Sequence, residues 1–203
     1  MNSNQSGCIQ IGVAGGIGSG KSTVCKVIEQ LGYPVFYSDQ EGKKLMVHDP
    51  KMIKQVKAIF GPEAYINNDL NRPFLAEKVF QNRKLLSQLN DIVHPAVREA
   101  FNRFTELNCE KKLIFNEAAI LFETGAFRNF DVNILVIAPK NIRISRIMTR
   151  DNTSQDQVIS RMNNQWEDDK KIPLADYVIH NSDSDDLEPQ IKEIITHLKD
   201  KFY

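Results

Sequence analysis

Residues 15–22 (GGIGSGKS) match the pattern G-x-x-x-x-G-K-[ST], which is typical of loops that hold polyphosphates. Glycines in such a loop let its backbone N–H groups point inward at phosphate oxygens. Lys21 would reach the β- and γ-phosphates, the Ser22 hydroxyl would ligate Mg²⁺, and Thr23 would lie near the α-phosphate. The predicted phosphate-binding residues are Gly16, Ile17, Gly18, Ser19, Gly20, Lys21, Ser22 and Thr23.

This loop lies where its chemistry requires, between a predicted strand and a predicted helix. Residues 8–14 (CIQIGVA) form an apolar run that is typical of a buried strand. Residues 21–31 carry apolar side chains at helical spacing, and Gly32 ends the pattern. The positive end of the helix dipole would face the phosphates. A glycine-rich turn without a ligand is the alternative, and it would leave this agreement of motif and context unexplained.

Two carboxylates follow predicted strands and are candidates for proton transfer and metal binding. Asp39 follows the second strand (33–37), and Glu117 follows the third (112–115). The carboxyl ends of parallel strands form the edge at which such sheets bind ligands. Asp39 would orient an acceptor hydroxyl and take its proton, or it would cap the next helix. Glu117 would hold the metal through water, or it would cap a turn.

Arginines recur in the second half of the chain at a spacing that suits a spread phosphate charge. Arg143, Arg146 and Arg150 lie at i, i+3 and i+7, so they share one helical stripe; the first two are on a predicted helix (142–149), and Arg150 directly follows it. Arg161 follows on the next predicted helix (152–166). Guanidinium groups on a closing lid would stabilise a transferring phosphoryl group and exclude water. A solvated helix face is the alternative.

A histidine and an arginine form a further candidate pair in the middle of the chain. His94 precedes Pro95, and Arg98 follows one helical turn later. The residue types leave two interpretations open, because the pair would contact a substrate or would mark the start of a helix.

The elements that must position these groups alternate between strands and helices, which predicts an α/β fold with a parallel sheet covered on both faces. Residues 131–137 and 175–179 are the fourth and fifth predicted strands, and 187–198 is the closing helix. No strong strand is expected between residues 38 and 107, so this stretch is predicted to be a helical insertion. Its predicted helices are 39–47, 50–60, 72–80, 83–92 and 95–106.

The chain has 203 residues with 26 basic and 26 acidic side chains, so its formal net charge is +0. This balance argues against a nucleic-acid partner, which usually requires a basic surface. Three widely spaced cysteines form no zinc pattern. Residues 1–7 are polar and lack signal-peptide features, and no apolar run reaches the roughly 18 residues of a membrane span. We therefore expect a cytoplasmic monomer without a membrane partner.

Five segments occur in order along the chain and together resemble one known family. They are residues 12–24 (GVAGGIGSGKSTV), 90–98 (NDIVHPAVR), 120–125 (ILFETG), 146–165 and 175–181 (ADYVIHN). This ordered set resembles the signatures of the dephospho-coenzyme A kinases over about residues 9–198, nearly the whole chain. The first segment is more specific than a general phosphate-binding loop.

The resemblance implies a P-loop NTPase fold, a three-layer α/β/α sandwich with a five-stranded parallel sheet like that of nucleoside monophosphate kinases. It implies that ATP, with Mg²⁺, phosphorylates the 3′-hydroxyl of the ribose of dephospho-CoA to give CoA and ADP. It also implies three parts. These are a nucleotide-binding core (1–38, 108–139 and 172–203), a helical acceptor domain that binds the CoA moiety (39–107) and a lid (140–171).

Individual positions carry over by their place in these segments. Asp39 matches the family's proposed base, His94 and Arg98 match groups beside the acceptor, and Asn181 matches an asparagine near the adenine. The matching lid arginines are Arg146, Arg150 and Arg161.

Two positions depart from the family's pattern. The family often has Asp-Ala-Asp where this chain has Tyr37-Ser38-Asp39, so only the last carboxylate is kept. Glu117 stands where the family often has aspartate, and its longer side chain makes a water-mediated metal contact as plausible as a direct one.

Two other classes of protein share parts of this pattern. A different small-molecule kinase, of the nucleoside monophosphate or shikimate type, predicts the same loop and lid but not the His-Pro segment or the long helical insertion. A GTP switch protein would use Asp-x-x-Gly, which residues 39–42 fit, but no Asn-Lys-x-Asp for guanine occurs in the chain.

Overall fold

The computed structural model describes residues 7–203, apart from the side chain of Gln81. The polar start of the chain, on which the expectation of no signal peptide depends, therefore lies outside the described residues except for Gly7. The chain divides into two compact units, one formed by Met1–Tyr37 with Thr105–Tyr203 and the other by Ser38–Phe104. No helix within residues 7–203 combines the length and the hydropathy needed to cross a membrane.

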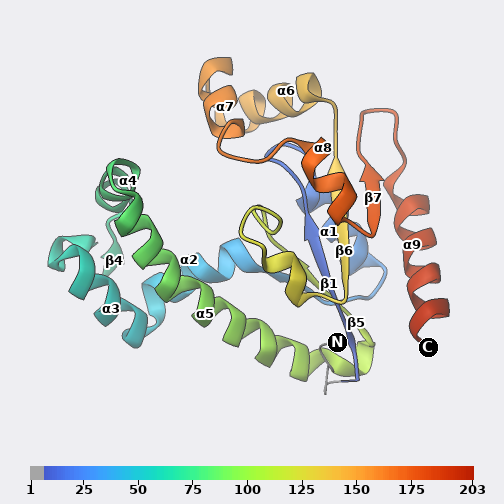
Figure 1. Cartoon of the computed structure of the whole chain (residues 1–203), viewed down its shortest axis with the longest axis horizontal. Helices are drawn as coiled ribbons and strands as arrows, with labels where there is room; N and C mark the ends of the chain where they lie inside the picture. The colour runs from blue at the N-terminus through green and yellow to red at the C-terminus, as the bar shows by residue number, and fades with distance from the viewer. Residues whose placement is uncertain (1–6) are drawn as a thin grey trace. The chain divides into compact units, whose positions relative to one another are not determined.

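The first unit contains a sheet of five parallel strands, shown in Figure 1. The strands are β1 (Ile9–Ala14), β2 (Val35–Tyr37), β5 (Leu113–Glu117), β6 (Val132–Ile137) and β7 (Tyr177–His180). Their order is β2-β5-β1-β6-β7, and every pair is parallel, which confirms the predicted α/β class and its five-stranded sheet. The order reverses direction at β1, so the loop after β1 opens at the switch point where open α/β sheets bind ligands.

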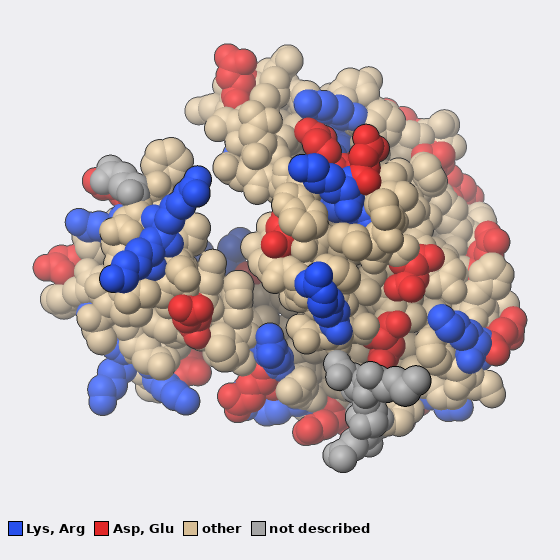
Figure 2. All heavy atoms as spheres, viewed as in Figure 1, with Lys and Arg blue, Asp and Glu red and all other residues tan. Residues whose placement is uncertain are grey.

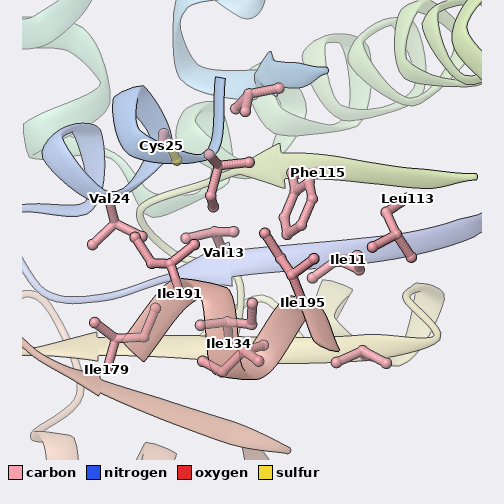
Figure 3. Packing of buried hydrophobic residues seen from close by; sticks show 14 of the residues in the cluster. Ile11, Val13, Val24, Cys25, Leu113, Phe115, Ile134, Ile179, Ile191 and Ile195 are labelled. Carbon is pink, nitrogen blue, oxygen red and sulfur yellow. The ribbon is translucent and has the colours of Figure 1, made fainter. Parts of the chain in front are cut away.

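One face of this sheet is covered by α1 (Lys21–Gln30) and α9 (Leu187–Phe202), which also contact each other. In Figure 3, Cys25 of α1 and Ile195 of α9 point toward strand residues such as Val13 and Phe115. The opposite face packs against the segment that follows β5, including Phe122. Because both faces are buried, the central strands consist almost wholly of buried side chains, as expected for a parallel sheet.

Three helices connect β6 to β7, namely α6 (Lys140–Asp151), α7 (Gln155–Met162) and α8 (Asp168–Lys171). The predicted helix 152–166 is wrong in its bounds, because α7 covers only Gln155–Met162. Its start is fixed by a capping box in which Ser154 and Gln157 exchange hydrogen bonds, and Val158 packs in a buried cluster with Ile147 of α6. The segment therefore has a small core of its own.

The second unit contains α2 (Ser38–His48), α3 (Pro50–Phe60), α4 (Arg72–Gln81) and most of α5 (Arg83–Asn108). One prediction for this stretch is wrong. The predicted helices 83–92 and 95–106 form the single helix α5, with Pro95 inside it. A short antiparallel hairpin, β3 (Tyr65–Ile66) with β4 (Asp69–Leu70), also lies in this stretch, where no strong strand was expected. Its turn residues Asn67 and Asn68 both have positive φ, which favours asparagine.

Candidate active site

The loop of residues 15–20 joins β1 to α1 and is shaped by glycines at close contacts. Gly18 (φ 80°) and Gly20 (φ 87°) lie in the left-handed region, which other residues rarely adopt. A Cβ atom on Gly20 would collide with the Asn181 amide, and one on Gly16 would collide with the Arg143 guanidinium. The structure therefore seats two side chains from the far end of the chain directly against this loop.

Backbone N–H groups of the loop are available to a phosphate. The Ser19 N–H donates to the Gly16 carbonyl (3.0 Å), which closes a tight turn. In the part of the chain that the structure describes, the N–H groups of Gly18 and Gly20 donate to no protein acceptor. N–H groups of glycine-rich loops that lead into a helix N-terminus are donors of the kind that bind phosphate oxygens.

Lys21 is the buried cation of this loop. Its Nζ donates to the Gly15 carbonyl (2.8 Å) and lies 3.7 Å from Oε1 of Glu117. Both side chains are only 9% exposed. Glu117 ends β5 beside Val13 of β1, so strand pairing fixes its carboxylate next to the start of α1. The sequence predicted both residues for the site, and the structure brings them together as a buried pair.

The donor atoms available to a metal are a hydroxyl and a carboxylate. Ser22 is the second residue of α1, and Glu117 lies beside the start of the same helix. Burial and, to a lesser degree, the negative charge of Glu117 raise the pKa of the Cys25 thiol on α1. Within residues 7–203, no group of three or more histidine, cysteine, aspartate or glutamate residues could hold a metal ion. One hydroxyl and one carboxylate oxygen fit Mg²⁺, which takes few protein ligands and completes its shell with phosphates and water.

Asn181 lies against the phosphate loop. Its Nδ2 donates to the Ser19 carbonyl (2.8 Å), and its own carbonyl accepts from Nη1 of Arg146 (2.9 Å). The second terminal nitrogen of Arg146 donates to Oδ1 of Asp183 (3.1 Å). Asn181 is buried, and β7 positions it because it directly follows that strand. Sequence similarity predicts Asn181 near the adenine, and the structure gives it a direct bond to the loop backbone.

The arginines of the predicted stripe have three different surroundings. Arg143 is buried, and its Nε donates to the Ile17 carbonyl (3.0 Å) while its Nη1 donates to Oδ2 of Asp168 (3.1 Å). Arg146 faces Asn181, as described above. Arg150 is more exposed and makes a two-point contact with its neighbour Asp151, at 2.7 and 3.1 Å. The stripe therefore points at protein acceptors in this structure.

Asp151 connects two of the predicted lid arginines. It accepts from Arg150 and also from Nη1 of Arg161 (2.7 Å), which comes from α7. Hydrogen bonds from these two guanidinium groups hold the pKa of Asp151 well below its usual range. The three side chains form one exposed charge cluster, named here the Asp151 cluster.

A second charge cluster is buried behind the loop, and the sequence analysis did not identify it. Lys171 is 1% exposed, and its Nζ lies 3.1 Å from Oε1 of Glu123 and 3.9 Å from Oδ1 of Asp168. The Trp166 N–H also donates to Oε1 of Glu123 (3.1 Å). Acidic and basic side chains lie close together in Figure 2 where Figure 1 draws α8. The sequence of α8 consists of charged residues only, which is also typical of a helix exposed to solvent, so it does not by itself indicate a buried cluster.

Three predicted site residues belong to the second unit. Asp39 is exposed in the first turn of α2, and His94 and Arg98 lie one turn apart on α5. Gly42 follows Asp39 by one turn and lies against Val93 and Val97 of α5, where a Cβ atom would be 3.4 Å from each side chain. The contact brings the start of α2 to the stretch of α5 that carries His94 and Arg98. Partial burial and, to a lesser degree, Arg98 lower the pKa of His94.

Comparisons with known proteins give a consistent result. A family model described as dephospho-CoA kinase matches residues 9–186. A dephospho-CoA kinase of Bacteroides fragilis is 38% identical over 195 residues, covering 96% of this chain and 95% of that protein. One from Salinibacter ruber is 41% identical over 174 residues, covering 84% and 87%.

Solved structures agree. The Thermus thermophilus protein TT1252 has a TM-score of 0.83 at 32% identity, covering 97% of this chain and 98% of that chain. A dephospho-CoA kinase from Campylobacter jejuni has a TM-score of 0.69 at 25% identity, covering 96% and 98%.

Proposed function

Because the chain belongs to the dephospho-CoA kinase family, we propose that it transfers the γ-phosphate of ATP to the 3′-hydroxyl of the ribose of dephospho-CoA, giving CoA and ADP. The observation that carries this proposal is the buried pair of Lys21 and Glu117 at the base of a glycine loop with available N–H groups. This arrangement combines a fixed cation, amide donors and a carboxylate where a nucleotide triphosphate would place its phosphates and metal.

ATP is held mainly by the loop and the start of α1. The N–H groups of Gly18 and Gly20 face the phosphates, and the dipole of α1 adds partial positive charge. Lys21 neutralises charge on the β- and γ-phosphates as it builds up on the leaving oxygen. Ser22 and Thr23 are exposed at the first turn of α1 and lie next in line toward the α-phosphate. The remaining proposed contacts to ATP are Gly16, Ile17, Ser19 and Asn181.

The acceptor is prepared by residues of the second unit. Asp39 accepts the hydrogen bond of the ribose 3′-hydroxyl and takes its proton as that oxygen attacks the γ-phosphorus. The bond between the γ-phosphorus and the β–γ bridging oxygen breaks in line, and ADP leaves. His94 and Arg98 orient the acceptor, and support comes from α2 crossing α5 beside them at Gly42. The domain boundaries at Ser38 and Phe104 support assigning residues 39–107 to acceptor binding.

Mg²⁺ would be held by Ser22 and Glu117. When bound, it would supply positive charge against the negative charge that develops on the phosphates during transfer. The Glu117 carboxylate is also the partner of Lys21, so it fixes the position of the ammonium group that meets the phosphates.

Residues 140–171 serve as the lid over the transferring phosphate. Arg146 and Arg150 exchange their present carboxylate and carbonyl partners for γ-phosphate oxygens, and Arg161 contacts the acceptor. Their side chains support this role because they already lie at hydrogen-bonding distance from anionic or carbonyl oxygens. Exclusion of water by the lid limits hydrolysis of ATP.

A coupled ADP-release assay with a panel of acceptors tests the function. Dephospho-CoA, AMP, adenosine and shikimate are offered in parallel with ATP and Mg²⁺. We expect turnover with dephospho-CoA alone, and a Lys21→Ala variant should lose on the order of 10²-fold or more in kcat/KM. Turnover with AMP or shikimate but not dephospho-CoA would overturn the proposal and favour another small-molecule kinase.

We also propose that the enzyme works as a cytoplasmic monomer. The balance of 26 basic and 26 acidic side chains supports this, as does the scatter of exposed apolar residues such as Ile66, Phe80 and Leu107 over different elements. Cys8, Cys25 and Cys109 form no disulfide, which suits a reducing compartment. Light scattering of the purified protein tests the oligomeric state, and a mass near twice 23.2 kDa would contradict it.

A further inference from the structure

Ile17, at the tip of the phosphate loop, is held through both of its backbone polar groups. Its N–H donates to Oε1 of Gln165 (2.7 Å), and its carbonyl accepts from Nε of Arg143 (3.0 Å). These two side chains come from more than a hundred residues away in the sequence. Gln165 is further directed by its Nε2, which lies 3.5 Å from the Ala119 carbonyl.

Arg143 contacts the phosphate loop directly and also bonds to a carboxylate outside the loop. A Cβ atom on Gly16 would collide with its guanidinium, and one on Gly18 would lie 2.6 Å from its backbone carbonyl. The other side of the guanidinium bonds to Asp168, which belongs to α8. The side chain is only 8% exposed, so the guanidinium is enclosed between the loop and α8.

Gln165 lies just before the buried charge cluster of Lys171. The next residue, Trp166, donates its N–H to Glu123, and Glu123 is the ion-pair partner of Lys171. Asp168 faces both Lys171 and Arg143. The Asp168 carboxylate therefore ties Arg143 to this buried network, and loss of a charged member would leave a charge buried without its partner. Gln165 is connected to the network through the backbone of its neighbour Trp166.

We infer that Gln165 and Arg143 are positioning residues that fix the backbone of Ile17, so that the N–H groups of Gly18 and Gly20 are aimed at the phosphates before the nucleotide arrives. The inference rests on the proposed function and deepens it. The loop is an irregular segment, and a loop ordered in advance loses less conformational entropy on binding. Arg143 therefore acts through the loop, whereas Arg146 and Arg150 are the arginines proposed to meet the phosphate.

A set of variants at Gln165 separates this role from general stability. Gln165→Met keeps the side-chain length but removes the acceptor for the Ile17 N–H. Gln165→Glu keeps an oxygen acceptor. The matched control is Asn164→Ala, because Asn164 is the adjacent residue and its amide donates to the Ser160 carbonyl of the preceding helix α7 (3.2 Å). A second route is Arg143→Lys, which keeps the charge beside Asp168 but removes the planar guanidinium that reaches Ile17.

Two measurements report on the loop without requiring turnover. Hydrogen exchange of the Ile17 amide, followed by NMR, reads the Gln165 bond itself, and calorimetric titration with ADP reads phosphate binding. For Gln165→Met we expect exchange at Ile17 to be about tenfold faster and ADP binding about tenfold weaker, the effect of losing one buried hydrogen bond. Gln165→Glu should restore protection at Ile17, and Asn164→Ala should match the parent protein in both.

In steady-state kinetics, the inference predicts that the KM changes for one substrate and not for the other. Gln165→Met and Arg143→Lys should raise the KM for ATP and leave the KM for dephospho-CoA unchanged, which a general loss of stability would not do. Unchanged exchange at Ile17, or unchanged ADP affinity in both variants, would overturn the inference. Exchange and ADP binding do not depend on the acceptor, so a failure to phosphorylate dephospho-CoA would refute the proposed function and leave this inference standing.

Discussion

The buried pair of Lys21 and Glu117 makes a prediction that separates stability from catalysis. Removing the ammonium in Lys21→Met leaves the Glu117 carboxylate buried without that charge. For unit charges 3.7 Å apart, at an effective dielectric constant of about 20, Coulomb's law gives about 4.5 kcal/mol of attraction. Part of this is recovered by relaxation, and broken buried pairs typically cost about 3–5 kcal/mol.

The expected result follows from that magnitude. We expect Lys21→Met to lose about 3–4 kcal/mol of unfolding free energy, which lowers the Tm by roughly 6–16 °C for a chain of this size. The double variant Lys21→Met/Glu117→Gln removes both charges and should recover most of the lost Tm. Activity should behave differently, because both variants lack the cation at the phosphates and should remain reduced by on the order of 10²-fold or more.

The assays are thermal unfolding followed by circular dichroism and the coupled ADP-release assay, with Glu117→Gln alone as the fourth member of the cycle. A single Lys21→Met variant with an unchanged Tm would refute the energetic reasoning. A double variant with restored activity would refute the assignment of Lys21 to phosphoryl transfer.

Three further predictions concern other parts of the site. Gly20→Ala should weaken ADP binding about tenfold or more, because its Cβ atom would displace the Asn181 amide; Gly32→Ala has a similar φ (89°) with no neighbour within 4 Å and serves as the control in calorimetric titration. Asp39→Asn should lower kcat by about 10²–10⁴-fold and change the KM for ATP less than about twofold; steady-state rates near normal would remove it from the base role. Because the pKa of His94 is lowered in the folded protein, the parent should lose stability relative to His94→Gln as the pH falls below about 6.5, and urea titrations that show the opposite slope would contradict this.

The sequence predicted best what local signals determine. The glycine pattern, the strand before it and the helix that begins at Lys21 were all predicted in place, because each depends on neighbouring residues. The capping box of Ser154 and Gln157 was also present in the sequence, and reading it would have moved the predicted start of α7 from residue 152 to 155.

Sequence-based prediction of helix bounds was wrong where packing between helices overrides the local preference of a residue. Pro95 predicted a helix break because proline lacks an N–H and crowds the preceding turn. The structure continues α5 through it, and Val93 and Val97 on either side pack against Gly42 of α2. Helix–helix contact thus compensates for the lost backbone hydrogen bond.

The spacing of residues along the sequence also could not predict hydrogen-bond partners that come from distant segments. The i, i+3, i+7 pattern correctly placed Arg143 and Arg146 on one helix, but their acceptors, including Ile17, Asp168 and Asn181, lie elsewhere in the sequence. The bond between Ile17 and Gln165 spans 148 residues, and only the fold brings the two together.

The Asp151 cluster has a consequence for how the reaction cycle ends. Arg150 and Arg161 share the Asp151 carboxylate, so the proposed turn of Arg150 toward the γ-phosphate would exchange one anionic partner for another. When the product leaves, the Asp151 carboxylate would be at hand to pair with Arg150 again. A built-in counter-ion of this kind would compete with a bound phosphate for the guanidinium groups and so weaken the binding of product.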